Sequence, residues 1–362
     1  MKVIIAGGGT GGHIFPAIAI ANALLRIDAA TEILFVGANG KMEMEKVPKE
    51  GFKIIGLDVV GFNRSNIFKN LSLPFKLWKS RRTAIQILKD FQPNVVVGVG
   101  GFASFPILNA SQSLGIPTLI QEQNSFAGKT NKILGKKADA ICVAYDNMEQ
   151  FFPQEKIIKT GNPVRAIISQ ATVSQADALA KWNWDNSKLT LLVVGGSLGA
   201  KTINDAIAKN AQALVDANIQ VIWQTGKNFV KEAAAIQQQF PNHIKAQEFI
   251  YDMENAYAAS DMIVSRAGAL AIAEICIVAK PTVFVPYPFA AEDHQTSNAK
   301  ALWHKKAAWI VEDKNASVEL LPHILELGQS ASLRKEMAAA LREIAIADAD
   351  QRIAEKVRAI AQ

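Results

Sequence analysis

The chain has 362 residues, of which 49% are hydrophobic and 20% charged, and its formal net charge is +6. This length suggests two domains, and the average composition excludes disordered and fibrous proteins. The only two cysteines, Cys142 and Cys276, lie far apart in apolar runs, which excludes a disulfide scaffold and a thiolate zinc site and fits a reducing compartment. No apolar stretch reaches the ~18 residues of a membrane span, and glycines interrupt the N-terminal run too early for a secretion signal. We therefore expect a soluble cytoplasmic protein.

Short apolar runs alternate with helix-like stretches along the whole chain. Strands are predicted at residues 3–6, 33–36, 95–99, 118–120 and 140–144 in the first half, and at 189–194, 220–223, 262–264 and 282–285 in the second. Helices are predicted at 14–25, 81–89, 202–218 and 293–303, with a long Ala-rich helical tail at 332–360. Continuous Val and Ile runs are typical of strands buried on both faces of a parallel sheet. The repeated order predicts an α/β protein with two doubly wound parallel sheets.

The two predicted domains differ in charge. Gly-Asn-Pro at residues 161–163 breaks both helix and strand, and it predicts domains at 1–162 and 163–340. Residues 1–160 hold 19 basic and 12 acidic side chains, whereas the rest of the chain holds 20 and 21. The positive excess therefore belongs to the first domain.

Much of this excess lies in residues 62–82, which contain six basic and no acidic side chains, interleaved with Phe, Ile, Leu and Trp. Such a segment suits an anionic membrane surface, where each Lys or Arg contributes about 1 kcal/mol. A core-facing helix with a solvated basic face fits the same pattern equally well. Nucleic acid is disfavoured, because the chain has no RNP-like, zinc-finger or helix-turn-helix pattern.

A run of glycines from Gly7 to His13 follows the first predicted strand and precedes a helix. Glycines let a phosphate approach the backbone, and a helix N-terminus favours negative charge. The run has the G-x-G-x-x-G spacing of dinucleotide sites, but the second strand ends in Gly37-Ala-Asn39, without a carboxylate for a ribose. A nicotinamide site is therefore disfavoured, as is a Walker motif, since no Lys-Ser or Lys-Thr follows. A tight turn without a ligand is the structural alternative.

A second glycine-rich turn, from Gly195 to Ala200, again lies between a buried strand and a helix. We interpret it as a second anion-binding turn, in which the Ser197 hydroxyl donates to a phosphate oxygen. Its Gly-x-Ser-x-Gly spacing also matches the nucleophile elbow of hydrolases, with His294 and Asp293 as candidate partners. The hydrolase hypothesis is disfavoured because it leaves the first glycine run without a purpose. A purely structural turn is again the alternative.

Two further segments follow predicted strands, at the edge where open α/β sheets bind ligands. Residues 265–274 open a helix with small side chains, and Glu274 is placed to accept hydrogen bonds from the vicinal hydroxyls of a ribose. A partner for the helix dipole is the alternative role for Glu274. Residues 286–295 form a loop in which Gln295 can bond a sugar hydroxyl.

Six motifs together resemble the MurG family of peptidoglycan glycosyltransferases: GGGTGGH at the start, GGFASFP at 100–106, QEQNSFAG at 121–128, GNPVR at 161–165, GGSLGA at 195–200 and SRAGALAIAE at 265–274. The resemblance implies a GT-B fold, with two Rossmann-like domains facing each other across a cleft and a C-terminal helix, at about 340–362, that packs back on the first domain. It also implies inverting transfer of N-acetylglucosamine from UDP-N-acetylglucosamine to undecaprenyl-pyrophosphoryl-MurNAc-pentapeptide, the step from lipid I to lipid II.

The same resemblance assigns roles to residues of both domains. Ile250 packs beside the uracil and offers its backbone, Glu274 takes the ribose hydroxyls, Ser197 and Arg165 face the diphosphate, and Gln295 holds the transferred sugar. Residues of the first glycine run and Asn124 reach the donor sugar, and that run also approaches the acceptor diphosphate. The residues implied to bind UDP-N-acetylglucosamine are Thr10, Gly11, Gly12, Asn124, Arg165, Ser197, Ile250, Ala269, Leu270, Ala271, Ile272, Ala273, Glu274 and Gln295.

The family further implies a peripheral protein at the cytoplasmic face of the inner membrane, docked through residues 62–82 and active in cell-wall biogenesis, cell shape and division. Other cell-wall synthesis proteins are candidate partners, and no cofactor is expected. No metal site is predicted either, because the other histidines are scattered. Asp348 and Asp350 have the D-x-D spacing of manganese-dependent glycosyltransferases, but their position in the terminal helix predicts a solvated face.

His13 is the candidate general base, because imidazole titrates near neutral pH. Its alternative roles are a hydrogen bond to the diphosphate and a structural contact within the loop. Two other functions compete with the transferase. A nicotinamide oxidoreductase would bind NAD(H) rather than UDP-N-acetylglucosamine, and a membrane-docking nucleotide sensor would bind the UDP-sugar without turnover.

Overall fold

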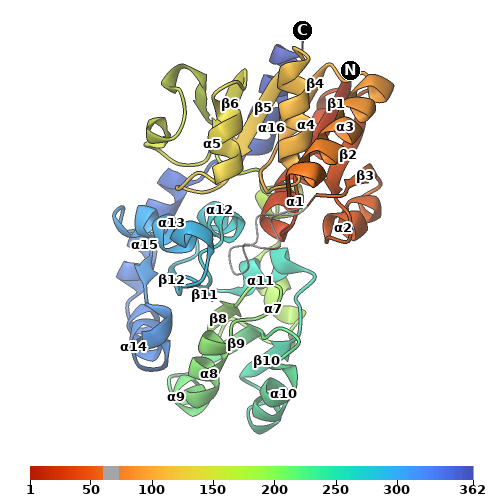
Figure 1. The fold of residues 1–362 in the computed structure, drawn as a ribbon. Helices are drawn as coiled ribbons and strands as arrows, with labels where there is room; N and C mark the ends of the chain where they lie inside the picture. Colours follow the sequence, from red (N-terminus) through yellow and green to blue (C-terminus); the bar gives the residue numbers. More distant parts are fainter. Residues whose placement is uncertain (60–72, 362) are drawn as a thin grey trace. The chain divides into compact units, whose positions relative to one another are not determined.

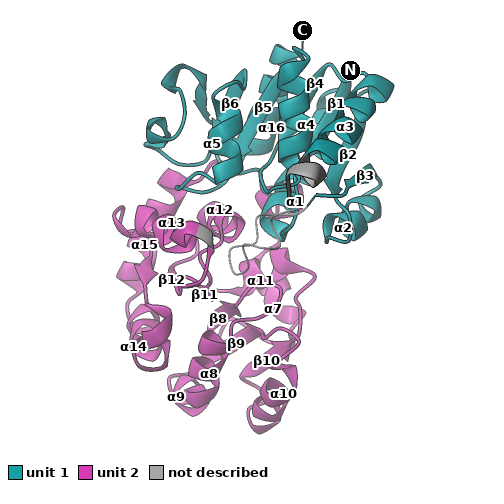
Figure 2. Ribbon diagram, in the orientation of Figure 1, with its two compact units in different colours: residues 1–165, 347–362 teal, residues 166–346 magenta. Residues whose placement is uncertain are grey.

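A computed structural model describes residues 1–59 and 73–361 of the chain (Figure 1). The chain forms two compact units, one made of residues 1–165 and 347–362 and the other of residues 166–346 (Figure 2). Each unit contains one sheet whose strands are all parallel, with helices packed against it. The predicted α/β class with two doubly wound parallel sheets is confirmed.

The sheet of unit 1 has the order β3 (Lys53–Leu57), β2 (Glu32–Ala38), β1 (Lys2–Ala6), β4 (Val95–Gly98), β5 (Thr118–Glu122), β6 (Ala140–Val143) and β7 (Ile157–Lys159). In β1, Val3 and Ile5 face one hydrophobic cluster, while Ile4 and Ala6 face another on the opposite side of the sheet. This two-sided burial explains why β1 is a continuous apolar run rather than an alternating one.

Helices cover both faces of this sheet. The first cluster is closed by α1 (Gly11–Ile27) and α16 (Ala349–Ile360). The second is closed by α3 (Leu73–Phe91), α4 (Ser104–Ser113) and α5 (Lys129–Gly135). A further helix, α2 (Glu43–Lys49), links β2 to β3, and short 3₁₀ turns occupy Met148–Gln150 and Gln154–Lys156.

The terminal helix α16 packs on α1 in unit 1, with Ile353 and Val357 fully buried. Asp350 is only 7% exposed and forms an ion pair with Arg26 of α1. The prediction of a solvated D-x-D face is therefore wrong for Asp350, because Arg26 lies close enough to compensate its burial. Asp348 instead pairs with Arg352 at 2.9 Å on the exposed side of the same helix.

The sheet of unit 2 has the order β10 (Ile244–Gln247), β9 (Ile219–Gln224), β8 (Leu189–Val194), β11 (Met262–Ser265), β12 (Thr282–Phe284) and β13 (Trp309–Ile310). Its helices are α6 (Ala166–Ser169), α7 (Gln175–Ala180), α8 (Lys201–Lys209), α9 (Ala211–Asp216), α10 (Val230–Gln239), α11 (Met253–Ala259), α12 (Ala269–Val278), α13 (His294–Trp303), α14 (Ala316–Gln329) and α15 (Ala331–Ile344). Short 3₁₀ turns occupy Ala291–Asp293 and Asp313–Asn315.

Two predicted helices are each divided in the structure. The stretch predicted at 202–218 forms α8 and α9, which meet at Asn210, whose side-chain amide donates to the Ala206 carbonyl at 2.8 Å. The predicted tail forms α15 and α16, separated at Ala345, which adopts extended backbone angles. The second break lies at the passage from unit 2 back to unit 1.

Most of the basic and apolar stretch 62–82 lies outside the described residues. From Trp78 onward, α3 has a core face that includes Ala84 and Leu88, both buried. Trp78 itself is 57% exposed, and the Arg82 guanidinium lies 5.4 Å from the centroid of its ring. The described part of the helix thus has both a buried face and an exposed aromatic and basic one. Among the described residues, no helix is long and apolar enough to cross a membrane.

Both cysteines are buried as free thiols. Burial raises the pKa of Cys142, in β6, to about 12 and that of Cys276, in α12, to about 12, from a usual value of 9.0. Because only the thiolate reacts, we expect neither cysteine to be labelled by Ellman's reagent at pH 8 in the native protein. Both should react once the chain is unfolded in denaturant; rapid labelling of either thiol without denaturant would contradict this assignment.

Candidate active site

The strand order places a topological switch point in each sheet. In unit 1 the chain winds outward in opposite directions from β1 and β4, and in unit 2 from β8 and β11. Ligands of open α/β sheets bind outside the carboxyl ends of the strands at this point. Both glycine-rich turns follow the first strand of a sheet and therefore lie at a switch point.

The first glycine-rich turn ends where α1 begins, with Thr10 at the N-cap. The Thr10 side chain is exposed and makes no capping hydrogen bond. The first N–H groups of a helix have no partner within it and carry the positive end of its dipole, so Gly11 and Gly12 present donors suited to an anion. A Cβ on Gly101, which follows β4, would lie 2.4 Å from the Gly8 carbonyl oxygen, so the two switch-point loops of unit 1 are in contact.

A buried carboxylate bonds the first glycine-rich turn to the end of β2. Glu43, at the start of α2, is 1% exposed and accepts hydrogen bonds from the N–H of Gly9 at 2.9 Å and of Ala38 at 3.0 Å. An acid does therefore follow β2, five residues beyond Ala38, although the sequence shows none at the tip of the strand. Because Glu43 is buried and bonded to two amides, it is not available to a ribose, which further disfavours a nicotinamide site.

His13 is held by a side-chain amide that fixes its tautomer. The Gln123 Nε2 donates to the carbonyl oxygens of Val99 at 2.8 Å and Gln121 at 3.1 Å, which orients the amide. Its Oε1 then lies 3.0 Å from Nδ1 of His13. Since Oε1 can only accept, Nδ1 carries the proton in the neutral imidazole and the basic lone pair is on Nε2.

The amide that holds His13 belongs to a larger buried network in unit 1. Gln121 donates to Asn162 Oδ1 at 3.0 Å, and Asn162 donates to the Gln123 carbonyl at 2.9 Å. Beside them, the buried Glu122 carboxylate accepts from the N–H groups of Asn124 at 3.1 Å and Gly128 at 3.0 Å. Because the two bonds to Glu122 tie the N–H groups of Asn124 and Gly128 to one buried carboxylate, they hold the loop that carries Asn124 against the end of β5.

Arg165 lies near the same end of α1. Its guanidinium is 5.8 Å from the centroid of the Phe15 ring, and its side chain is partly exposed. A guanidinium over an aromatic face is attracted by the ring quadrupole and keeps its N–H groups at the ring edge. A cation is thus present in unit 1 beside the first turn of α1.

The second glycine-rich turn, between β8 and α8, is held by backbone contacts. The Gly199 N–H donates to the Gly196 carbonyl at 3.0 Å, and both glycines adopt positive φ, +77° and +89° respectively. A Cβ on Gly199 would lie 2.0 Å from the Thr225 carbonyl oxygen, so no other residue fits there. Ser197 is exposed at the tip of this turn, as a phosphate donor would have to be.

Gln224, buried at the end of β9, ties this turn to Ile250. Its Nε2 donates to the Gly196 carbonyl at 2.9 Å, and its Oε1 accepts from the Ile250 N–H at 3.0 Å. The Ile250 side chain is 1% exposed. The Ile250 N–H is therefore already used within the protein, and a backbone contact to a nucleobase would have to come from its carbonyl.

The helix α12 begins after Gly268 at the carboxyl end of β11. Ala269 and Ile272 are buried against the unit, whereas Leu270, Ala271, Ala273 and Glu274 are partly exposed. Tyr257 of α11 donates its hydroxyl to Glu274 Oε2 at 3.0 Å. This contact fixes the carboxylate near the start of the helix.

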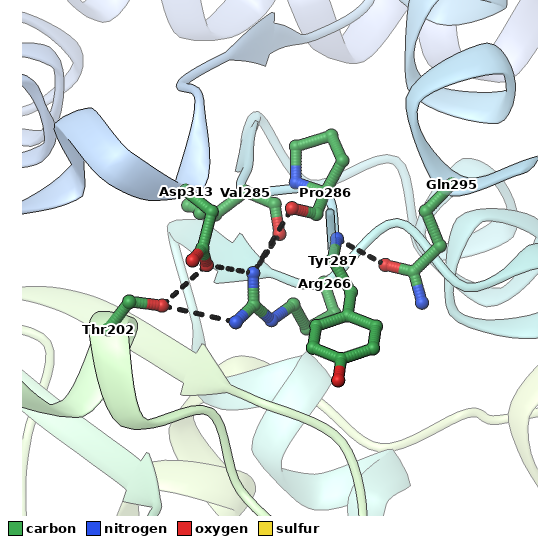
Figure 3. Close-up of polar contacts among 7 residues, drawn as sticks. All are labelled: Thr202, Arg266, Val285, Pro286, Tyr287, Gln295 and Asp313. Carbon is green, nitrogen blue, oxygen red and sulfur yellow. Dashed lines mark hydrogen bonds and ion pairs between the residues drawn. The ribbon is translucent and has the colours of Figure 1, made fainter. Parts of the chain in front are cut away.

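Arg266, which follows β11, is the centre of a polar cluster in unit 2 (Figure 3). Its Nη1 donates to Asp313 Oδ1 at 2.5 Å and to the carbonyl oxygens of Val285 at 3.0 Å and Pro286 at 3.2 Å. Its Nη2 donates to Thr202 Oγ1 at 3.1 Å. The side chains of Arg266 and Asp313 are only 12% and 16% exposed, so this is a largely buried, well-bonded ion pair.

Gln295 is connected to this cluster through Tyr287. The guanidinium of Arg266 lies 5.5 Å from the centroid of the Tyr287 ring, and the Tyr287 N–H donates to Gln295 Oε1 at 2.9 Å (Figure 3). Because Oε1 is used in this way, Gln295 would meet a sugar hydroxyl through its NH₂ group. Arg266 thus supports the loop that presents Gln295.

The sequence matches two family models, the glycosyltransferase family 28 N-terminal domain over residues 3–143 and the corresponding C-terminal domain over residues 190–353. The chain belongs to glycosyltransferase family 28. A Bacteroides thetaiotaomicron relative, named UDP-N-acetylglucosamine–N-acetylmuramyl-(pentapeptide) pyrophosphoryl-undecaprenol N-acetylglucosamine transferase, is 49% identical over 100% of this chain and 98% of its own. A Cytophaga hutchinsonii relative of the same name is 49% identical over 98% and 96%.

The fold of this family 28 chain is likewise similar to solved structures. MurG from Acinetobacter baumannii is 31% identical, with a TM-score of 0.81 over 99% of both chains. UDP-GlcNAc 2-epimerase from Neisseria meningitidis is 15% identical with a TM-score of 0.68, which shows the shared fold alone. Two doubly wound parallel sheets together with the likeness to MurG identify the GT-B fold.

The site residues predicted for this family 28 chain fall into two groups. In unit 1, Thr10 to His13 form the start of α1, Arg165 lies over Phe15 of that helix, and Asn124 lies in the loop after β5. In unit 2, the turn with Ser197 is tied to Ile250 through Gln224. Residues 269–274 lie in α12 and Gln295 at the start of α13.

Several residues that shape these loops have no role in the sequence-based prediction: Glu43, Glu122, Gln123, Gln224, Tyr257, Arg266 and Asp313. Their contacts join segments that are distant in sequence. Arg266 and Asp313 are 47 residues apart, and His13 and Gln123 are 110 apart. For Glu122, Gln123, Gln224 and Arg266 the available signal was polarity at the end of an apolar strand, where a charged or amide side chain needs a partner, whereas Glu43, Tyr257 and Asp313 lie outside strands and give no such signal.

Proposed function

We propose that the chain transfers N-acetylglucosamine from UDP-N-acetylglucosamine to undecaprenyl-pyrophosphoryl-N-acetylmuramyl-pentapeptide, converting lipid I to lipid II in peptidoglycan synthesis. The observation that carries this conclusion is the full-length identity of 49% to relatives that bear this activity in their names. The chain is a UDP-sugar-dependent hexosyltransferase.

We assign the donor nucleotide to unit 2. The turn at 195–200 offers backbone amides and the exposed Ser197 hydroxyl to a diphosphate, and Glu274, held by Tyr257, offers a carboxylate to the ribose. We assign the Ile250 carbonyl to the uracil and the Gln295 NH₂ group to the sugar, because the Ile250 N–H and the Gln295 Oε1 are already bonded within the protein. These groups lie on loops and helices that directly follow the strands of one parallel sheet, as ligand sites of open α/β sheets do.

We assign the acceptor to unit 1. The first-turn amides of α1 and the cationic Arg165 suit a second diphosphate, that of the lipid, and Asn124 and the Thr10 hydroxyl suit sugar hydroxyls. The exposed Trp78 and Arg82 of α3 support docking on an anionic membrane surface at the cytoplasmic face of the inner membrane. Because the proposed reaction belongs to peptidoglycan synthesis, we also propose other proteins of cell-wall synthesis as partners and a role in cell shape and division.

The reaction is proposed to be an inverting displacement. The acceptor hydroxyl loses its proton to Nε2 of His13 as its oxygen forms a bond to the anomeric carbon. The bond from that carbon to the UDP oxygen breaks, and UDP leaves with the electron pair. Ser197 and the amides of its turn stabilise the charge that develops on the diphosphate. The Gln123 Oε1, which accepts from Nδ1–H, stabilises the imidazolium in the position that His13 already occupies.

The test is incorporation of labelled N-acetylglucosamine from its UDP form into a polyprenyl-pyrophosphoryl-N-acetylmuramyl-pentapeptide acceptor. We expect the full chain to form the disaccharide lipid and to show no oxidation or reduction of NAD(H). A chain that binds UDP-N-acetylglucosamine but forms no product is a sensor rather than an enzyme, and that outcome would overturn the proposal.

Glu274 yields a prediction about the ribose. Its carboxylate is proposed to accept from the ribose hydroxyls, so 2′-deoxy-UDP should bind about tenfold more weakly than UDP. In Glu274→Ala the two nucleotides should bind equally, because the group that distinguishes them is gone. Isothermal titration measures both affinities, and Glu336→Ala, which removes an exposed carboxylate of α15, is the matched control. A preference for UDP that survives in Glu274→Ala would assign Glu274 to the helix dipole instead.

A further inference from the structure

Two contacts join the first glycine turn to β2: the Gly7 N–H donates to the Val36 carbonyl at 3.3 Å, and the Glu43 side chain bonds the turn beyond that point. Glu43 is 1% exposed, and it accepts from Gly9 in the turn and from Ala38 at the end of β2. A carboxylate that accepts two buried N–H groups forms charge-assisted hydrogen bonds, which are the strong ones. Glu43 therefore joins the turn after β1 to the end of β2.

The surroundings of Glu43 are shaped to receive it. A Cβ on Gly8 would lie 2.1 Å from its Oε1, and a Cβ on Gly37 would lie 2.5 Å from its Cγ. A larger side chain at either glycine would therefore collide with Glu43. On the opposite side, the Gly8 carbonyl is packed against Gly101. The turn is thus clamped between Glu43 and the loop after β4.

The same contact limits what the turn can offer to an anion. The N–H of Gly9 points to Glu43, so this amide is not directed at a ligand. A phosphate at this turn would be bound by the first-turn amides of α1, which follow Gly9 directly. The Thr10 carbonyl also accepts from the N–H of His13 at 3.1 Å. The position of Gly9 therefore sets the position of Thr10 and of the first turn that ends at His13.

We propose that Glu43 is a positioning residue for transfer: it fixes Gly9 so that Thr10 to His13 meet the acceptor and the donor sugar in reactive alignment. This inference rests on the proposed function and deepens it. Alignment of reacting groups is a large part of catalysis in a two-substrate reaction, and a small displacement of the support is costly. Glu43 itself touches no substrate.

The decisive variant is Glu43→Gln, assayed in the full chain with UDP-N-acetylglucosamine and the lipid acceptor. Gln has the same size but only one acceptor oxygen, so its NH₂ group must face one of the two N–H donors. We expect kcat/KM for the acceptor to fall by about ten- to a hundredfold. The Kd of UDP, which is assigned to unit 2, should remain at the wild-type value. Glu45→Gln, on the exposed side of the same helix, is the matched control and should transfer normally.

A second substitution, at Gly37, tests the position of the Glu43 side chain. Gly37→Ala places a methyl group against Glu43 Cγ and should lower transfer in the wild-type background. In the Glu43→Ala background, where Cγ is absent, the same substitution should cost less further activity, because only the contact of the new methyl group with Ile54 Cδ1, at 3.2 Å, remains. Additive losses would contradict the proposal.

The outcomes separate the inference from the function on which it rests. Transfer by the wild type with normal kcat and KM in Glu43→Gln would overturn the positioning role and leave the function intact. A lowered melting temperature in Glu43→Gln, with unchanged kcat and KM for the folded protein, would make Glu43 merely structural and would also overturn it. Absence of transfer by the wild type would refute the function itself.

Discussion

Replacing His13 by Ala is expected to lower kcat for transfer by about two to four orders of magnitude, the range that a positioned general base contributes. The Kd of UDP should not change, because the nucleotide is assigned to unit 2. The reason lies in the contact with Gln123, which fixes the proton on Nδ1 and the lone pair on Nε2. Single-turnover rates with saturating substrates measure the chemical step directly.

A second substitution separates the base from the two other roles considered for this residue. His13→Gln keeps a polar donor in the loop but cannot take up a proton near neutral pH. If His13 only bonds the diphosphate or orders the loop, His13→Gln should restore much of the activity that His13→Ala loses. Equal losses in both variants are expected here, and near-normal turnover in either one would rule His13 out as the base. His304→Ala, at the exposed end of α13, controls for loss of a histidine in general.

Removing Arg266 is expected to destabilise unit 2 by about 3 kcal/mol, because breaking a largely buried ion pair leaves the other charge uncompensated. Arg266→Ala leaves Asp313 with Thr202 as its remaining partner in the cluster of Figure 3. It also removes the donor that the Val285 and Pro286 carbonyls share. The melting temperature of the purified chain, followed by calorimetry, should fall by several degrees.

The same variant tests the support of the sugar loop. The Arg266 guanidinium packs against the Tyr287 ring, and the Tyr287 N–H donates to Gln295. Arg266→Ala should therefore raise KM for UDP-N-acetylglucosamine more than the Kd of UDP. Lys201→Ala is the control, since it breaks an exposed pair with Asp205 whose side chains are 83% and 46% exposed. Surface pairs contribute about 0–1 kcal/mol, so that variant should melt like the wild type. Arg266→Ala with an unchanged melting temperature would contradict the assigned burial.

The interior strands were predictable from the sequence, whereas the edge strands were not. Every interior strand coincides with a predicted apolar run, as in β8, predicted at 189–194 and found at Leu189–Val194. The four strands without a prediction are β3, β7, β10 and β13, which are the edges of the two sheets. An edge strand is partly solvated, so its sequence, such as KIIGL in β3 or IKAQ in β10, lacks a continuous apolar run.

The positions of the two glycine-rich turns were likewise predictable, whereas the residues that hold them in place were not. Glycine spacing after a strand predicted where the two turns lie, because that pattern is local. The residues that hold the turns were not predictable, because Glu43 lies 34 residues from Gly9 and its partner is a backbone amide with no sequence signature. The break between α15 and α16 was missed for a different reason. The residues around Ala345 contain neither Gly nor Pro, and extended backbone there follows from the passage between units rather than from propensity.

Hydrogen–deuterium exchange of the full chain with saturating UDP tests most directly where the nucleotide binds. We expect slower exchange in peptides that cover residues 195–200, 249–251 and 268–274, with no change in residues 7–13. Slower exchange confined to residues 7–13 and 99–103 would place the nucleotide in unit 1 and would contradict the assignment of donor and acceptor made here.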